Sequence, residues 1–192
     1  MSSFHSVFGY FCIKTKVTAP AAIERASVLC LQTTYCLLPI SKMLQPLNLP
    51  PYPFKISDDN GTLTLFDEIR KKTIIITPEE WVRQHFVQYL IKQKNYPRSL
   101  IKLEGGLKLN TLQKRTDIVV FNPSGQRILM VECKAPSVTI DQKTFDQIAR
   151  YNMVHKVSLL AVSNGLQHYY CTINHENCTY QFIEELPGYV KG

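Results

Sequence analysis

The sequence of 192 residues lacks several features that mark whole classes of protein. It contains no run of about 18 apolar residues, so it predicts no membrane-spanning helix. It contains no GxxxxGK(S/T) motif, which excludes a P-loop motor driven by ATP. Cysteines are few: six occur in all, and the three that follow residue 42 are an odd number. Because a clear secretion signal is also lacking, we expect no disulfide framework and predict a cytoplasmic protein.

What is present is ordinary for one globular domain. Hydrophobic residues make up 45% of the chain, and its length is sufficient to bury a core without disulfides or a structural metal. Acidic residues are the minority, with 15 against 22 lysines and arginines, and the net charge is +7. This balance is compatible with a polyanionic partner but does not by itself identify one.

Residues 1–42 differ from the rest of the chain. They contain three of the six cysteines and sustain no helical or strand period. Their basic start is followed by the charged pair Glu24 and Arg25 rather than by a clean apolar stretch, which argues against a secretory signal. We expect either a poorly ordered extension or a start assigned too early, with Met43 opening a domain over 43–192. Removing the four basic residues and one acid of this segment lowers the net charge to +4.

A helix is predicted to begin at Thr77. This residue is a suitable N-cap, Pro78 suits the first helical position, and Glu80 completes a capping box with Thr77. Apolar residues then recur at helical spacing until Pro97, which ends the helix.

Short segments rich in β-branched or large apolar residues predict strands after this helix. The predicted elements are strands over 100–109, 117–121 and 128–131, a helix over 141–155, a strand over 157–162 and a closing hairpin over 169–183. Before the first helix, residues 63–76 predict a small hairpin or a strand packed on the side. Strands joined by tight turns are antiparallel, and a helical crossover then adds a strand that can be parallel to its neighbour. The predicted fold is therefore α/β, with a mixed central sheet flanked by helices in the order helix–three strands–helix–strand, and a C-terminal hairpin.

The residues suited to chemistry lie between positions 115 and 134. Asp117 opens one predicted strand, and Glu132 and Lys134 close the next. Residues two apart on a strand share a face, so Glu132 and Lys134 project together while Cys133 points into the opposite layer. A tight turn makes the two strands neighbours, and the natural register places Asp117 beside the Glu132 end.

Carboxylates gathered at one point predict a hard divalent cation between them. Mg²⁺, which Mn²⁺ can replace, prefers oxygen ligands, and Asp117, Glu132 and the backbone carbonyl of Cys133 would supply them. A water bound to such an ion attacks a phosphodiester, and Lys134 would orient that water or stabilise charge on the phosphorus oxygens. This chemistry needs no small-molecule cofactor.

The spacing from Asp117 to Glu132–Lys134 resembles the PD-(D/E)XK nuclease signature. Downstream, Gln147 and Tyr151 match the QxxxY motif of RecB-like members and of type I restriction R subunits, and at this spacing they share one face of a helix. Upstream, Glu80 matches the acid on the first helix of the same group. The ordered set is far more specific than an acid followed by ExK alone.

From about residue 47 onward, the sequence is similar to small stand-alone proteins that resemble the N-terminal domain of the type I restriction enzyme R subunit. The residue before Asp117 is Thr116 rather than proline, a position that varies in this group. The resemblance implies a restriction-endonuclease-like fold and a Mg²⁺-dependent deoxyribonuclease whose partner is DNA. It assigns catalytic or supporting roles to Glu80, Asp117, Glu132, Lys134, Gln147 and Tyr151. Because the chain lacks the helicase of a complete R subunit, it would cut alone or lend cleavage to restriction-system subunits.

Several of these residues have simpler interpretations. The acid–acid–lysine set can be a structural ion pair at a sheet end, and Glu80 can serve only as a cap that reaches back to Thr77. Lys114 and Arg115 are candidates for contacts with DNA phosphates or an ordinary solvated strand start. Glu104 is either a further active-site acid or a strand-end charge.

A zinc site is a further candidate in the C-terminal hairpin. His168, Cys171, His175 and Cys178 have a suggestive spacing, but they fall on or beside strands whose neighbouring positions alternate faces. Core cysteines and a polar turn explain them better. The basic run Arg70–Lys72 is interpreted as a solvated face.

Two functions of another class stay open beside the nuclease. One is a non-catalytic DNA-binding module that keeps the nuclease fold, and the other is an interaction module of a restriction or repair system. The intact acid set argues against the former, because a simple binder gains nothing from carboxylates that face phosphates.

Overall fold

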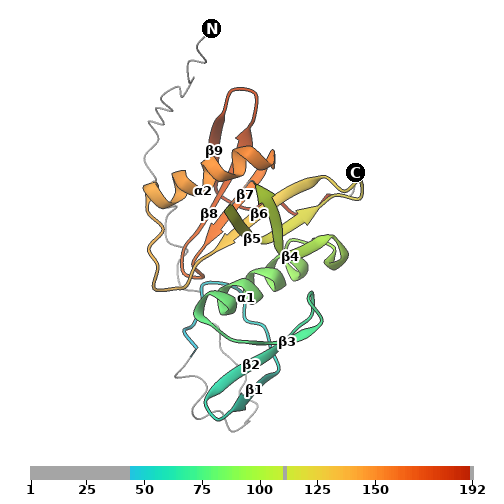
Figure 1. The fold of residues 1–192 in the computed structure, drawn as a ribbon, viewed down its shortest axis with the longest axis vertical. Helices are drawn as coiled ribbons and strands as arrows, with labels where there is room; N and C mark the ends of the chain where they lie inside the picture. Colours follow the sequence, from blue (N-terminus) through green and yellow to red (C-terminus); the bar gives the residue numbers. More distant parts are fainter. Residues whose placement is uncertain (1–43, 110–111, 191–192) are drawn as a thin grey trace.

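The structure, a computed structural model, describes residues 44–109 and 112–190. The interpretation of residues 1–42 as an extension lies outside these residues. The described part of the chain forms two α-helices and two β-sheets (Figure 1). Its elements are β1 (Ile56–Asp59), β2 (Thr62–Asp67), β3 (Lys72–Ile75), α1 (Pro78–Lys92), a 3₁₀ turn (Arg98–Leu100), β4 (Ile101–Leu109), β5 (Leu112–Phe121), β6 (Arg127–Cys133), α2 (Gln142–His155), β7 (Leu159–Ser163), β8 (His168–Asn174) and β9 (Thr179–Ile183).

The larger sheet has six strands in the order β4-β5-β6-β7-β8-β9. Strands β4, β5 and β6 are antiparallel neighbours, and β6 pairs in parallel with β7 after the crossover through α2. The predicted order of helix, three strands, helix and strand is therefore confirmed, and so is the mixed sheet. The C-terminal hairpin is present as β8 and β9, and it extends the same sheet beyond β7.

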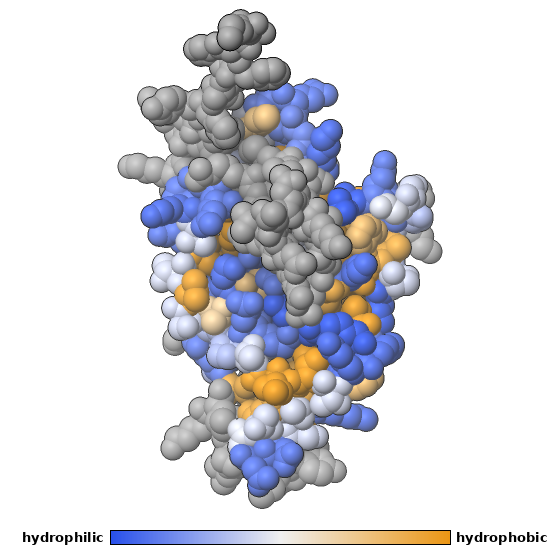
Figure 2. Space-filling view, viewed as in Figure 1, coloured by the Kyte–Doolittle hydropathy of each residue, from blue (hydrophilic) through white to orange (hydrophobic). Residues whose placement is uncertain are grey.

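The smaller sheet is the antiparallel meander β1-β2-β3. The sequence predicted a hairpin or a side-packed strand here, and the structure adds β1 as a third strand through a turn at Asn60 and Gly61, which have positive φ. Figure 1 shows α1 lying between this small sheet and the larger one. Leu63 and Leu65 of β2 are buried, whereas Phe66 on the other face is half exposed. Figure 2 shows an apolar area near this sheet among largely polar surroundings.

The core of the larger sheet has two layers because strand residues alternate between its faces. One layer lies against α1, and the other lies against α2. The layer on α1 includes Val82, Phe86, Leu90, Ile118, Val120, Leu129, Val131 and Cys133. The layer on α2 includes Val119, Met130, Phe145, Ile148, Leu160, Val162 and Cys171. The sheet is thus covered by a helix on each face, as the alternating pattern predicts.

Both helices begin at side-chain caps, and Thr77 is the cap that the sequence predicted. The Thr77 hydroxyl accepts the backbone N–H of Glu80 at 3.1 Å, and the Asp141 carboxylate accepts that of Thr144 at 2.7 Å. α2 ends before Lys156, whose φ is 53°. Neither helix in the described ranges combines the length and the hydropathy that crossing a bilayer requires.

The chain that leads into the small sheet is attached where β7 ends. The backbone N–H of Asn48 donates to the carbonyl of Gly165 at 2.7 Å, and its side-chain amide donates to the carbonyl of Leu166 at 2.8 Å. A Cβ placed on Gly165 would lie 2.7 Å from Leu47 Cδ2 and 2.9 Å from Val82 Cγ2. Gly165 therefore allows the lead-in, α1 and β7 to approach closely.

Replacing Gly165 with alanine should destabilise the protein for two reasons. The residue has a φ of +82°, and the new Cβ would overlap a fully buried valine. We expect G165A to lose about 2–4 kcal/mol of the free energy of unfolding in urea titrations. G125A is the matched control, because Gly125 has a φ of +77° and nothing within 4 Å of a new Cβ. Equal losses in the two variants would contradict this close approach.

Candidate active site

Asp117 lies at the centre of a buried cluster of charged side chains. Only 8% of the residue is exposed. One carboxylate oxygen accepts a hydrogen bond from Arg83 Nη2 at 2.7 Å, and the other accepts the backbone N–H of Cys133 at 2.7 Å. The β5–β6 register pairs Ile118 with Val131, so Asp117 faces the end of β6. The structure thus brings Asp117 next to the predicted Glu132–Lys134 segment.

Glu132 and Lys134 lie side by side, as their spacing predicts. Lys134 Nζ donates to a Glu132 carboxylate oxygen at 2.7 Å, and the lysine side chain is 27% exposed. Burial lowers the pKa of Lys134, but the hydrogen bond to Glu132 and the charges of Glu132 and Asp117 outweigh it, so the pKa is raised. The ammonium therefore stays charged at neutral pH and is suited to stabilising negative charge.

Cys133 points to the opposite face, into the layer against α1. Its side chain is fully buried, and burial together with the charge of Asp117 raises the pKa of the thiol well above its ordinary value. A protonated, inaccessible thiol is neither a nucleophile nor a metal ligand. The predicted contribution of this residue is its backbone carbonyl alone.

Arg83 is the central residue of the cluster, and the sequence analysis did not identify it. Its guanidinium binds Asp117 on β5 and also the carboxylates of Glu79 and Glu80 on its own helix. Burial alone would lower the pKa of Arg83, but Asp117 and Glu80 raise it, so the group stays charged. The i,i+3 and i,i+4 spacing to the two glutamates was a signal for local ion pairs. Nothing in the sequence indicated the partner on β5.

Glu80 has a different structural role from the one its capping position suggests. Its backbone N–H binds the cap, but its carboxylate does not reach back to Thr77 and instead binds Arg83, Arg70 Nη2 at 2.5 Å and Gln84 Nε2 at 2.9 Å. The residue is 7% exposed. The simple interpretation of Glu80 as a reciprocal capping residue is therefore wrong.

The network continues from Glu80 into the small sheet. Arg70 Nε donates to Asp67 at 2.5 Å, and the same carboxylate accepts Gln84 Nε2 at 2.8 Å and the backbone N–H of Ile69 at 2.7 Å. Asp67 is fully buried. The interpretation of Arg70–Lys72 as a solvated face is wrong for Arg70, because its side chain is 13% exposed and bridges two acids.

Other predicted site residues are only partly described. Gln147 lies on α2 and is exposed. Tyr151 also lies on α2, and Glu104, Lys114 and Arg115 lie on β4 and β5, but their side chains are outside the described set. For these four residues the structure gives the backbone position alone.

The histidines and cysteines of the C-terminal hairpin have separate surroundings. His168 contacts Ser163 Oγ at 2.8 Å and the Asn48 carbonyl at 3.1 Å, whereas His175 Nε2 lies 3.1 Å from the carbonyl of Val157. Cys171 is buried in the layer against α2, and Cys178 is exposed in the β8–β9 turn. Among the described side chains, no three of the types His, Cys, Asp and Glu group closely enough to hold a metal.

The donor set around Asp117 nevertheless fits a hard divalent cation. It offers two carboxylates from neighbouring strands and one backbone carbonyl, which are ligands that Mg²⁺ accepts together with waters. Among the described residues of the cluster, five carboxylates face three cationic groups. The carboxylates are Asp67, Glu79, Glu80, Asp117 and Glu132, and the cations are Arg70, Arg83 and Lys134. One divalent ion would balance the two surplus negative charges.

Fold and cluster together define a mixed α/β protein with acids, arginines and a lysine gathered where its central strands end. The chain belongs to the family described as type I restriction enzyme R protein N terminus (HSDR_N), whose profile matches residues 78–187. The match runs from the start of α1 to just beyond β9, so the small sheet lies outside it.

A similar solved structure is a fragment of a protein described as an HsdR subunit of a type I restriction enzyme from Vibrio vulnificus YJ016. The two share 17% sequence identity with a TM-score of 0.41, and the match covers 57% of this chain and 23% of that chain. This chain therefore spans about a quarter of the length of that relative. A comparison with curated proteins finds no match.

Replacing Asp67 with asparagine tests the part of the network that lies outside the family match. The pKa of Asp67 lies below its ordinary 3.8, because hydrogen bonds from Arg70 and Gln84 outweigh the effect of burial. We expect D67N to lose about 2–4 kcal/mol of unfolding free energy at pH 7 in urea titrations, because Arg70 loses a buried counter-charge.

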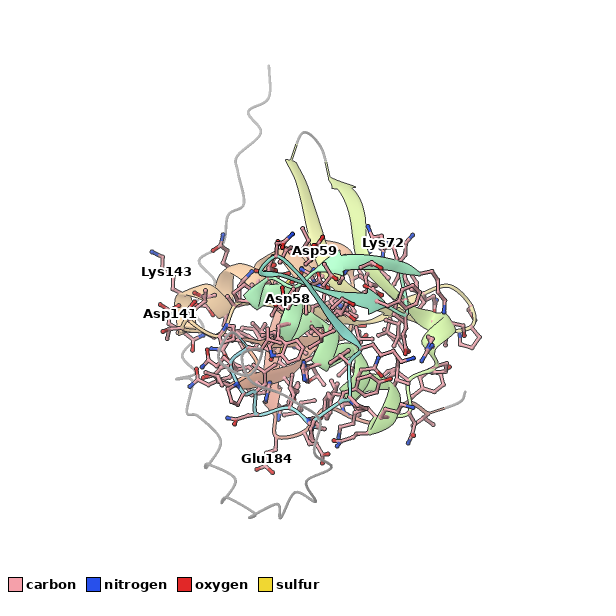
Figure 3. All side chains as sticks on the ribbon, turned by 90° about the horizontal axis from the view of Figure 1, so that it is seen from below. Asp58, Asp59, Lys72, Asp141, Lys143 and Glu184 are labelled. Carbon is pink, nitrogen blue, oxygen red and sulfur yellow. The ribbon has the colours of Figure 1, made fainter. Side chains whose placement is uncertain are left out.

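The depressed pKa fixes the sign of the pH dependence. The stability that the Asp67 carboxylate contributes is present above about pH 4 and is lost as the pH falls through its lowered folded-state value. The gap between wild type and D67N should therefore shrink at pH 3. D58N is the control, since Asp58 is exposed near the end of β1 and accepts the Gly61 N–H (Figure 3). A gap that stays constant from pH 7 to pH 3 would rule out this role.

Proposed function

We propose that the chain is a Mg²⁺-dependent nuclease domain that hydrolyses DNA phosphodiester bonds and has a restriction-endonuclease-like core. The observation that carries the proposal is Asp117 held beside the Glu132–Lys134 pair at the end of β6. Membership of the restriction R-subunit family and the mixed sheet with a helix on each face support it. Restriction-system subunits are the partners that this proposal implies.

Each described residue has a task that follows from its contacts. Asp117, Glu132 and the Cys133 carbonyl would hold Mg²⁺ or Mn²⁺. The ion, when bound, supplies an activated water and neutralises phosphate charge. Lys134, already charged and next to Glu132, stabilises the negative charge that develops on the phosphorus oxygens.

The remaining predicted residues support this centre. Glu80 acts through Arg83, since its carboxylate is occupied by guanidinium groups and Gln84. Gln147 and Tyr151 on α2 keep their predicted tasks of orienting Lys134 or contacting a phosphate. Their place on one helix face at i and i+4 is compatible with a shared role.

Cleavage of plasmid DNA with Mg²⁺ or Mn²⁺ tests the assignment. We expect D117N and K134Q to lose at least about 100-fold in rate, because each removes a group that acts on the reacting phosphate. K143Q is the matched lysine control, since Lys143 is exposed at the start of α2 (Figure 3). Calorimetry should also detect Mn²⁺ binding that disappears in E132Q. If D117N and K134Q cut as fast as wild type, these residues are not the catalytic centre.

One specific observation favours the non-catalytic alternative. In this structure both Asp117 oxygens and one Glu132 oxygen already have protein donors, so these three oxygens are hydrogen-bonded without a metal. That alternative would be established if the protein binds DNA but does not cleave it with any divalent metal, and if calorimetry detects no heat of Mn²⁺ binding.

The best candidates for DNA contacts lie on the part of β5 that extends beyond its pairing with β6. Residues 118–120 pair with both β4 and β6, whereas residues 112–116 pair only with β4 residues 105–109. We call this two-stranded segment the β4–β5 ribbon, and it extends about 17 Å. It projects from the body of the molecule in Figure 3. Its sequence contains Lys108, Lys114 and Arg115 and no acid.

Removing charge from the ribbon should weaken DNA binding without touching the cluster. We expect the double variant K114Q/R115Q to bind DNA more weakly. The plot of the logarithm of the binding constant against the logarithm of salt concentration should become shallower, its slope decreasing in magnitude by about two. The control K55Q/K143Q removes the same charge from exposed positions elsewhere and should leave the slope nearly unchanged. Filter binding at several salt concentrations measures both. Equal slopes for the two double variants would exclude the ribbon as a DNA contact.

A further inference from the structure

Arg83 holds the same Asp117 oxygen that a metal would need. Its Nη2 donates to Asp117 Oδ1 at 2.7 Å, while the second oxygen accepts the Cys133 N–H at 2.7 Å. A divalent cation that uses Asp117 must therefore approach a buried guanidinium of like charge. The arginine neutralises Asp117 when no metal is present, and it opposes the metal when one arrives.

The same Nη2 already donates to a second acceptor, Glu79 Oε1. It lies 3.2 Å from Glu79 Oε1, and the Glu79 side chain is 44% exposed, in contrast to the 11% of Asp117. Meanwhile Nη1 is bound to Glu80, which Arg70 and Gln84 fix from the other side. The guanidinium can thus release Asp117 by a small rotation about its Glu80 anchor, and its donor keeps a partner throughout.

We propose that Arg83 is a positioning residue that works as an exchangeable counter-ion. In the metal-free site its Nη2 donates to both Asp117 and Glu79, and it releases Asp117 and keeps Glu79 when a divalent cation binds Asp117. This inference rests on the proposed nuclease function. It assigns Glu79 a role that the sequence did not indicate: an acceptor that makes metal binding less costly without being a ligand.

The proposal makes a specific statement about metal affinity. Glu79→Gln should weaken Mn²⁺ binding, because the displaced donor then has only a neutral acceptor. Arg83→Gln should tighten Mn²⁺ binding, because the competing cation is gone. The same Arg83 variant should cut more slowly at saturating Mn²⁺, because Asp117 is no longer held in position.

A double-mutant cycle separates the exchange from a simple charge effect. If Glu79 acted only through its charge, E79Q would weaken Mn²⁺ binding equally in every background, whereas the exchange operates only when Arg83 is present. We expect E79Q to weaken Mn²⁺ binding by about threefold or more in wild type and to have little effect in R83Q. Titration calorimetry of Mn²⁺ into wild type, E79Q, R83Q and E79Q/R83Q gives the four affinities.

Two controls complete the design. E184Q removes an exposed acid that lies on the opposite side from the β4–β5 ribbon (Figure 3) and should leave Mn²⁺ affinity unchanged. R83K keeps the positive charge, but lysine lacks the planar guanidinium that binds two acceptors at once. E79Q should therefore again have a reduced effect on Mn²⁺ affinity in the R83K background. If R83Q does not fold, as judged by thermal unfolding, the cycle is read with R83K.

The outcomes are decisive in either direction. An E79Q effect that is equal in the wild-type and Arg83-variant backgrounds overturns the exchange, and so does its absence in wild type. A wild-type protein that binds no Mn²⁺ and cuts no DNA overturns the nuclease proposal and this inference with it. A wild-type protein that binds Mn²⁺ and cuts DNA, but shows no coupling in the cycle, overturns the exchange alone.

Discussion

The buried ion pair between Arg83 and Asp117 is the interaction on which the rest of the site depends. It joins α1 to β5, and through Glu80 and Arg70 the same chain of charges reaches Asp67 in the small sheet. Charges taken out of water are tolerated only when they are paired and hydrogen-bonded, and loss of one partner leaves the other uncompensated. Two sheets and a helix are therefore constrained to one arrangement by groups that also form the candidate active site.

Local signals in the sequence were sufficient for the elements and for part of the site. The Thr77 cap starts α1 where expected because capping involves only neighbouring residues. The two-residue strand period placed Glu132 and Lys134 on one face for the same reason. The role of Arg83 was not predicted because its partner Asp117 is 34 residues away in the sequence. The burial of Arg83 also depends on how α1 packs on the sheet. Arg70 was predicted to be solvated because a run of basic residues in the sequence does not indicate how the small sheet packs on α1.

The position of the site follows from where pairing changes along β5. Up to residue 116 the strand belongs to the β4–β5 ribbon, and from residue 118 to residue 120 it is central in the larger sheet with neighbours on both sides. Asp117 therefore stands where a rigid, fully paired core meets a projecting edge. Groups at such a boundary are held in place by the core and lie next to the projecting ribbon. The candidate DNA contacts on the ribbon lie on the same strand as the proposed metal ligand.

The same arrangement places an acidic cluster next to a basic ribbon within one basic protein. The described residues of the cluster carry surplus negative charge, which repels a phosphate backbone, while the sequence of the ribbon and the chain as a whole are positive. In the proposed nuclease, DNA would be attracted along the ribbon but excluded from the acids until a divalent ion cancels their surplus. Metal binding would then control the approach of the scissile phosphate as well as its hydrolysis. In the metal-free protein, the guanidinium of Arg83 supplies positive charge that the metal would otherwise bring. The carboxylates of the cluster can therefore stay buried and charged before the metal binds.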